Sequence, residues 1–291
     1  MLFATQTNFS VEKLGLMDGV KLLIDAGYPA LDFSFFGEQD FVHCAEGREN
    51  AKRVRALAEE SGVIFHQAHA PYGGYLEAFL ANHAHKFPKV FEFAGALGVD
   101  QIVVHPIRPT PRYLGSERAY FDANLEYYAS LAPMARDCGI KIAIENMYGR
   151  NPVTNRIENA ICGNAAELAA LYDALGDEST FTVCLDIGHV ALCGFEPEDA
   201  IRTLGHDRLG ALHVQDVDYK TDLHFLPGTA NIKWDRVCRA LGEIDYKGVF
   251  NLEADKFLTE FDVDFYPTVT RFMAQTAKYY ADKVDSYRIK R

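Results

Sequence analysis

Hydrophobic residues follow two alternating spacings along this chain. Stretches with apolar residues at every third or fourth position, typical of amphipathic helices, are followed by short runs rich in Val, Ile and Leu, typical of buried strands. A glycine separates helix from strand at each junction, because glycine readily takes the left-handed conformation that ends many helices. The seven junction glycines are Gly27, Gly62, Gly98, Gly139, Gly176, Gly205 and Gly242.

Seven junctions divide the chain into eight strand–helix units. The junctions recur about every 36 residues, so that eight units fill nearly all of the 291 positions. Alternating strands and helices indicate a parallel sheet with right-handed crossovers, and eight units favour a closed barrel over an open sheet of six or seven strands. We therefore expect one α/β domain, a (β/α)8 TIM barrel over residues 1–283, followed by a polar tail at 284–291.

Composition and charge narrow the function classes. A chain with 48% hydrophobic residues has enough apolar surface for a large core, which excludes disorder. A net charge of −12 disfavours nucleic acid as a partner, because phosphates repel an acidic body. The six cysteines form no C-x-x-C pair, and we interpret them as reduced core residues. Neither a signal peptide nor a long apolar run is found, so we expect a cytoplasmic protein that does not bind membranes.

Six consecutive predicted strands end in His, Asp or Glu. In a TIM barrel, residues at these ends point into one shared mouth, where active sites lie. Carboxylates gathered in this way repel one another and raise their pKa values unless a cation neutralises them. Mixed carboxylate and imidazole ligands suit a divalent ion such as Mn2+, Zn2+, Co2+ or Mg2+. The residues at the strand ends are His69, His105, Glu145, Asp186, His189, His213 and Glu253.

The motifs around these strand ends resemble those of the xylose isomerase-like barrels. This superfamily includes sugar and sugar phosphate isomerases and epimerases, and also the type IV apurinic endonucleases. The motifs extend from the third to the eighth predicted strand. They are Val104-His-Pro106, Ile144-Glu-Asn146, Cys184-Leu-Asp-Ile-Gly-His189, Leu212-His-Val-Gln-Asp216, Asp222-Leu-His-Phe-Leu-Pro-Gly228 and Leu252-Glu253.

The resemblance implies one divalent metal ion and two catalytic glutamates. Its metal ligands fall on Glu145, Asp186, His213 and Glu253, and Glu145 and Glu253 would also act as acid and base. In the endonuclease members, further ligands build a three-zinc cluster. The positions of those further ligands are His69, His105, His189, Asp222 and His224.

Three features favour a small carbohydrate over DNA. The loops after the first, second and sixth predicted strands are acidic, whereas a duplex-binding protein needs a basic face. The segment Thr5–Ser10 lacks the glycine- and histidine-bearing start of the endonucleases, and Asp216–Trp234 is similar to the isomerase and epimerase branch. We therefore expect a metal-dependent sugar (or sugar phosphate) isomerase or epimerase. The alternatives are an endonuclease-like phosphodiesterase with three zinc ions, and a barrel that binds metal and sugar without turnover.

The expected reaction moves a proton through a metal-chelated ene-diolate of the sugar. Removal by one glutamate and return by the other inverts a stereocentre, whereas return to the neighbouring carbon interconverts aldose and ketose. We expect the substrate to be bound by His69, His105, His189, Asp222, His224 and Arg150.

The charge of the sugar is the least determined feature. Ala230 stands where the family usually has a second glycine, which disfavours a phosphate-binding loop and favours a neutral sugar. Two arginines on the loops after the fourth and fifth strands could instead clamp an anion. These arginines are Arg108, Arg112, Arg150 and Arg156, and the aromatic candidates for packing against a sugar are Phe36, Tyr72 and Trp234. The sequence is also compatible with a homo-oligomer.

Overall fold

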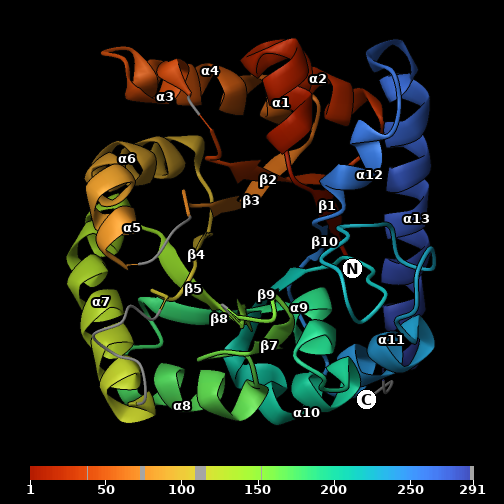
Figure 1. The fold of residues 1–291 in the computed structure, drawn as a ribbon. Helices are drawn as coiled ribbons and strands as arrows, with labels where there is room; N and C mark the ends of the chain where they lie inside the picture. The colour runs from red at the N-terminus through yellow and green to blue at the C-terminus, as the bar shows by residue number, and fades with distance from the viewer. Residues whose placement is uncertain (38, 73–75, 109–115, 152, 289–291) are drawn as a thin grey trace.

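The computed structural model describes residues 1–37, 39–72, 76–108, 116–151 and 153–288. Eight parallel strands of this part of the chain form a central ring, with helices packed around it (Figure 1). In chain order, the strands of the ring are β1 (Phe3–Thr5), β2 (Ala30–Ser34), β3 (Ile64–His69), β4 (Gln101–Val104), β5 (Lys141–Glu145), β8 (Phe181–Asp186), β9 (Leu209–His213) and β10 (Phe250–Leu252).

The hydrogen-bonded pairs close the ring. Six strands form one parallel sheet in the order β2-β3-β4-β5-β8-β9, and β1 pairs with β10, also in parallel. Single bridges from Gln6 to Asp32 and from Val214 to Leu252 join these two sheets. The predicted (β/α)8 barrel is therefore confirmed, and the open sheet is excluded.

The helices fill the connections between the strands. The last helix continues past residue 283, the predicted end of the barrel domain, to Tyr287. The division into a barrel domain and a polar tail stays a prediction. The α-helices are α1 (Asn8–Leu14), α2 (Leu16–Asp25), α3 (Asp40–His43), α4 (Gly47–Glu60), α5 (Leu76–Asn82), α6 (Phe87–Leu97), α7 (Glu117–Cys138), α8 (Ala165–Leu175), α9 (Ile187–Leu192), α10 (Pro197–Arg208), α11 (Trp234–Glu243), α12 (Asp255–Thr259) and α13 (Tyr266–Tyr287). Short 3-10 helices are η1 (Ala84–Lys86) and η2 (Val263–Phe265).

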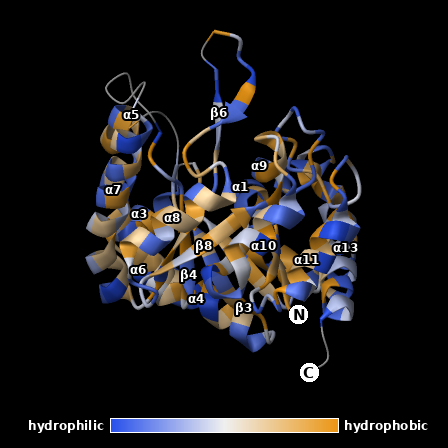
Figure 2. Cartoon of the chain, turned by 90° about the horizontal axis from the view of Figure 1, so that it is seen from below, coloured by the Kyte–Doolittle hydropathy of each residue, from blue (hydrophilic) through white to orange (hydrophobic). Residues whose placement is uncertain are grey.

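A hairpin that the hydrophobic pattern did not predict follows β5. Its antiparallel strands are β6 (Tyr148–Arg150) and β7 (Ile157–Asn159). The hairpin projects away from the barrel (Figure 2). It begins three residues after Glu145, so it rises beside the mouth at which the strands end.

Most junction glycines have the predicted conformation. Gly98, Gly139 and Gly176 are left-handed caps after α6, α7 and α8. Gly27 and Gly62 also have positive φ. Gly205 has positive φ as well, but it lies at a kink within α10 rather than after its end.

The prediction for Gly242 is wrong. This residue lies inside α11, and the left-handed residue after the helix is Asp245, with φ 54°. A Cβ on Gly242 would lie 2.6 Å from Cβ of Tyr287 in α13. Glycine is therefore needed here for close packing of α11 on α13, and not for ending a helix.

Part of the interior of the ring is lined by small side chains. Val103, Ala143, Cys184 and Ala211, on the neighbouring strands β4, β5, β8 and β9, form a buried cluster. The six cysteines are free, and three of them are fully buried. No helix in the described ranges is long and apolar enough to cross a membrane. The large apolar core between strands and helices fixes the strand ends, and these ends carry the candidate site.

Candidate active site

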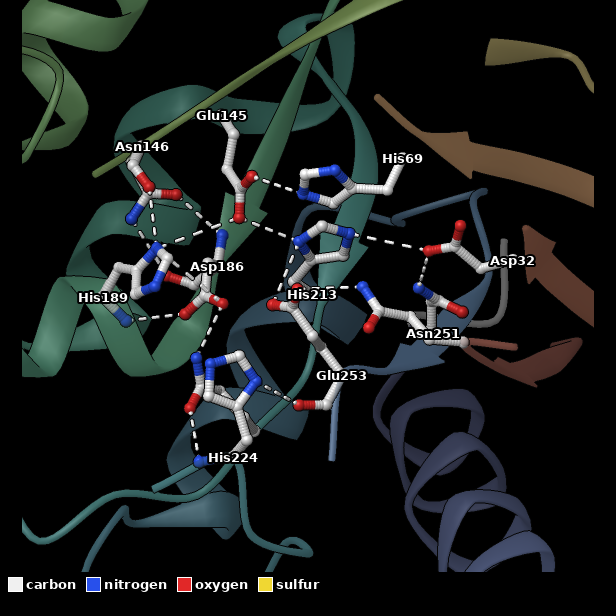
Figure 3. A network of polar contacts seen from close by, with 12 residues as sticks. Asp32, His69, Glu145, Asn146, Asp186, His189, His213, His224, Asn251 and Glu253 are labelled. Atoms are coloured by element: carbon white, nitrogen blue, oxygen red, sulfur yellow. Dashed lines mark hydrogen bonds and ion pairs between the residues drawn. The ribbon is translucent and has the colours of Figure 1, made fainter. Parts of the chain in front are cut away.

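Four buried side chains converge at the C-terminal ends of the strands. Glu145 ends β5, Asp186 ends β8, His213 ends β9, and Glu253 directly follows β10. One potential ligand atom of each lies within 4.8 Å of those of the others. Figure 3 shows these side chains pointing toward one another. The structure thus brings together the four residues that the resemblance assigned to the metal.

His213 stands between the two glutamates. Its Nδ1 lies 2.8 Å from Oε1 of Glu145 and 3.2 Å from Oε2 of Glu253. Oε1 of Glu253 accepts a hydrogen bond from Nε2 of Gln6 at 2.8 Å, whereas Oε2 is buried and accepts no well-directed hydrogen bond. A buried carboxylate oxygen without a donor is costly unless a cation binds it. Three carboxylates and one imidazole therefore fit a divalent cation in their donor chemistry.

The pKa values follow from this crowding. Burial raises the pKa of Asp186 to about 7, and the nearby Glu253 and Glu145 carboxylates add to the effect. Burial also favours neutral Glu145, but the imidazoles of His213 and His105 outweigh it and hold the pKa of Glu145 well below its usual range. Burial opposes protonation of His213, yet the surrounding acidic groups raise its pKa well above the ordinary value. A bound divalent cation would supply the positive charge that these shared protons otherwise provide.

The start of α9 fixes Asp186. Asp186 is the N-cap of this helix, and its Oδ1 accepts a 2.6 Å hydrogen bond from the backbone N–H of His189. The Asn146 side chain accepts from the backbone N–H of Asp186 and donates to its carbonyl oxygen, at 2.7 and 3.0 Å. These bonds hold the carboxylate at the mouth of the barrel.

His69 and His105 approach the other face of Glu145. Their Nε2 atoms lie 3.4 and 2.9 Å from Oε2 of Glu145. The three residues also have ligand atoms within 4.8 Å of one another, so they form a second group that could hold a metal ion. Burial lowers the pKa of His105 to about 4, which keeps this imidazole neutral near pH 7.

His189, Asp222 and His224 form a more open group. Nε2 of His189 lies 3.9 Å from Oδ1 of Asp222, and Nε2 of His224 lies 3.1 Å from Oδ2. Burial opposes a charged imidazole, but Asp222 raises the pKa of His224 to about 10, and the pKa of Asp222 is held well below its usual range. Within the described ranges, these three residues do not form a convergent ligand group.

The arginines predicted as substrate contacts are exposed where the structure describes them, unlike the buried candidate metal ligands. Arg150 is exposed on β6, where its guanidinium carbon lies 5.8 Å from the centre of the Tyr148 ring and its Nη1 donates to the carbonyl of Asn155. Arg108 and Arg156 are exposed, and Arg112 lies outside the described residues. The role of Arg150 in substrate binding therefore stays a prediction.

The loop after β9 is built around Asp216. Its Oδ2 accepts hydrogen bonds from the backbone N–H groups of Gly228 and Ala230 at 2.8 and 3.0 Å, and from Nε1 of Trp234 at 2.9 Å. These two N–H groups are therefore occupied, although a phosphate loop would need them free. Trp234 is buried and packs against Phe250, so the suggestion that it contacts the sugar is wrong.

The structure adds residues that sequence reasoning missed. Tyr148 donates a 3.3 Å hydrogen bond to Oδ2 of Asp222, and its ring meets that of His189 edge-on at 5.1 Å. Phe36 and Tyr72, which the sequence analysis did name as aromatic candidates, pack edge-on beside His69, with ring centroids 4.9 Å apart. Further missed residues support the four candidate metal ligands, either by direct hydrogen bonds or through Asp32. They are Gln6, Asp32, Gln67, Gln215 and Asn251. Polar residues inside apolar strands, such as Asp32, were the available signal.

A closed barrel with carboxylates and imidazoles at its strand ends defines a TIM-barrel protein with a candidate metal centre. The xylose isomerase-like TIM barrel family matches residues 20–266, and the chain belongs to this family.

The relatives include sugar epimerases. A D-psicose 3-epimerase of Agrobacterium fabrum is 32% identical over 123 residues, which cover 42% of this chain and 38% of that protein. A protein of Methanocaldococcus jannaschii is 26% identical over 192 residues, 64% of this chain and 62% of that protein. The chain thus spans less than two thirds of each of these relatives.

Solved structures share the fold over the whole chain. A D-tagatose 3-epimerase-like protein has a TM-score of 0.74 at 20% identity and covers 98% of this chain and 99% of its own. The IolI protein, with a binding zinc atom, has a TM-score of 0.72 at 16% identity and covers 100% of both chains. At these identities the likeness is one of fold.

Proposed function

We propose that the protein is a divalent-metal-dependent sugar epimerase or isomerase. One observation carries this proposal: Glu145 and Glu253 reach Nδ1 of the same imidazole, His213, from β5 and from the end of β10, at 2.8 and 3.2 Å. Two carboxylates arranged around one centre are the groups required for removing and returning a proton. The D-psicose 3-epimerases among the relatives support a ketose as the substrate class.

The metal would be held by Glu145, Asp186, His213 and Glu253, with Mn2+, Zn2+, Co2+ or Mg2+ as candidates. When bound, it would polarise the sugar carbonyl and stabilise the negative charge that develops on the substrate oxygens.

The glutamates supply the proton transfers. The pKa of each is held below its usual range although burial opposes this, so both are available as bases near pH 7. Removal of a carbon-bound proton by one glutamate, followed by its return from the other, inverts that carbon. Return to the adjacent carbon exchanges aldose and ketose. Glu145 and Glu253 come from strands that are not neighbours in the ring, β5 and β10, and the relatives include 3-epimerases, so epimerisation is the reaction that we favour.

The neighbouring polar groups would bind the sugar hydroxyls. His189 and Asp222 lie at the mouth beside Tyr148, and His69 and His105 line the opposite side. Each offers a donor or acceptor within the ring of strand ends. We expect a neutral sugar, because Asp216 occupies the N–H groups of Gly228 and Ala230.

Metal-stripped protein tests the proposal. The stripped protein is incubated with D-fructose, D-psicose and D-tagatose, then reloaded with Mn2+, Co2+, Zn2+ or Mg2+, and the sugars are separated by chromatography. Conversion of at least one ketose after reloading, and none before it, is expected. No conversion of any ketose or aldose by the reloaded protein would contradict the proposal.

A further inference from the structure

The buried amide of Gln215 joins the two halves of the site. Gln215 follows β9 by two residues, and its side chain is fully buried. Nε2 donates to Oδ2 of Asp186 at 3.0 Å, and Oε1 accepts from the backbone N–H of His224 at 3.0 Å. One side chain therefore contacts a candidate metal ligand on β8 and the loop residue that faces Asp222.

The orientation of this amide is determined by its partners. The backbone N–H of His224 is only a donor, so it must meet the amide oxygen. The NH2 group is then directed at Asp186, whose carboxylate is only an acceptor when ionised. The glutamine amide satisfies both partners at once, because it carries a donor and an acceptor on the same side-chain carbon.

The contact with His224 restrains an uncommon backbone conformation. His224 has φ 49°, in the left-handed region that residues with a Cβ rarely adopt. Its Nδ1 also lies 3.0 Å from the carbonyl oxygen of Glu253, and its Nε2 lies 3.1 Å from Asp222. The bond to Gln215 thus helps to hold the imidazole between these two partners.

The Gln215 side chain packs directly against Gly188. A Cβ on Gly188 would lie 2.7 Å from Cγ and Cδ of Gln215. Gly188 belongs to α9, directly after the Asp186 cap. The glycine in the Asp186-Ile-Gly-His189 motif therefore provides the space through which Gln215 reaches Asp186.

We propose that Gln215 is a positioning residue that sets the orientation of Asp186 toward the metal and of His224 toward the sugar. The role at His224 rests on the proposed function, because it concerns sugar binding. The role at Asp186 concerns metal binding alone. The two contacts of Gln215 have opposite hydrogen-bond polarity, and this makes them separable by substitution.

Two substitutions separate the contacts. Gln215→Glu keeps an acceptor for His224 but places a carboxylate oxygen against Asp186, whereas Gln215→Met removes both hydrogen bonds at similar volume. Gln39→Met is the matched control, since Gln39 is a buried glutamine whose amide donates to the backbone carbonyl of Ser34. Mn2+ affinity is measured by competition with a chelator, without sugar, and KM is measured with the best ketose.

Both Gln215 variants are expected to lose about 10- to 100-fold in Mn2+ affinity, while Gln39→Met keeps it. At saturating Mn2+, Gln215→Met is expected to raise KM more than Gln215→Glu does. Gly188→Ala, which displaces the Gln215 side chain, is expected to behave like Gln215→Met.

Unchanged Mn2+ affinity in folded Gln215→Met and Gln215→Glu would overturn the inference, as would a wild-type protein that binds no Mn2+ at all. Equal KM values in the two variants would overturn the role of Gln215 in orienting His224 toward the sugar. Absence of sugar turnover in the wild type would contradict the proposed function, and the chelator titration would still decide the role of Gln215 at Asp186.

Discussion

Asp32 lies behind His213, on the side away from the glutamates. Its Oδ2 is 3.6 Å from Nε2 of the imidazole, and both side chains are fully buried. The same oxygen accepts hydrogen bonds from Nε2 of Gln67 and Nδ2 of Asn251, at 2.8 and 2.7 Å. A buried carboxylate at this distance makes the imidazole a better ligand, because it stabilises positive charge on the ring.

Replacing Asp32 by Asn should therefore weaken the metal. The substitution keeps the size of the side chain and removes its charge, so we expect Mn2+ affinity to fall about 10- to 100-fold. Chelator competition measures the change. Asp100→Asn, at an exposed aspartate before β4, is the matched control and should bind Mn2+ like the wild type. Equal affinities for the Asp32 and Asp100 variants would show that the charge behind His213 has no influence on the metal.

Glu253→Gln should nearly abolish turnover. The amide preserves the shape but can neither accept a proton nor neutralise a cation, so we expect kcat to fall about 10^2- to 10^4-fold and the metal to bind less tightly. Glu260→Gln, at an exposed glutamate after α12, is the control. Wild-type kcat in the Glu253 variant would remove this residue from the proton transfer.

The Asp222–His224 pair should make stability depend on pH. The pKa of His224 is raised to about 10 in the folded protein, so its stabilisation is full below its ordinary pKa of 6.5 and is lost as the pH rises through about 10. The pKa of Asp222 is lowered, so its contribution is present above the ordinary value and is lost in acid.

His224→Gln should therefore lower Tm at pH 7, measured by calorimetry with a chelator present, and the difference from the wild type should shrink above pH 10. His206→Gln removes an exposed histidine and serves as the control. A Tm difference that is the same at pH 7 and pH 10.5 would contradict the pairing.

Substrate charge can be tested on one ketose and its phosphate. The N–H groups of Gly228 and Ala230 are bonded to Asp216, and Arg150 contacts Tyr148, so we expect the free sugar to have the higher kcat/KM. If Arg150 binds a hydroxyl of the sugar, as the sequence predicts, Arg150→Ala should lower kcat/KM for the free sugar and for its phosphate alike, by about 2- to 10-fold. A hundredfold preference for the phosphorylated form, lost in Arg150→Ala, would instead demonstrate an anion clamp.

Metal stoichiometry separates the two functions that the motifs allow. His69, His105 and Glu145 converge, but His189, Asp222 and His224 do not form a convergent group within the described ranges. We expect one tightly bound ion per chain and no cleavage of DNA with an abasic site. Three stoichiometric zinc ions together with such cleavage would favour the endonuclease.

The barrel and the gathering of polar side chains at its mouth were predictable because each rests on local sequence, whereas the choice of four candidate ligands among them came from the resemblance to the family. Helices ending in glycine gave the eight units, and the rule that strand ends share one mouth brought Glu145 together with His213. The function of Gly242 was not predictable, since it depends on Tyr287, a distant residue in α13.

The supporting residues of the site were not predicted either, because their roles also depend on residues that are distant in the sequence. Asp32 and Gln215 look like ordinary polar residues in apolar stretches, and their meaning comes from the partners that the fold brings to them. The β6–β7 hairpin is too short and too polar to give a periodic pattern, so Tyr148 was not recognised as a neighbour of Asp222.

Deuterium exchange into a ketose tests the central claim most directly, because it reports removal of the carbon-bound proton even when little product accumulates. The protein loaded with Mn2+ is incubated with D-fructose or D-psicose in D2O, and incorporation at the carbons beside the carbonyl is followed by NMR. Incorporation at one of these carbons is expected for the wild type, with none after metal removal and only residual exchange in Glu145→Gln and Glu253→Gln. Exchange that persists at the wild-type rate in both glutamine variants, or its absence from the metal-loaded wild type with every ketose, would contradict proton transfer by this pair.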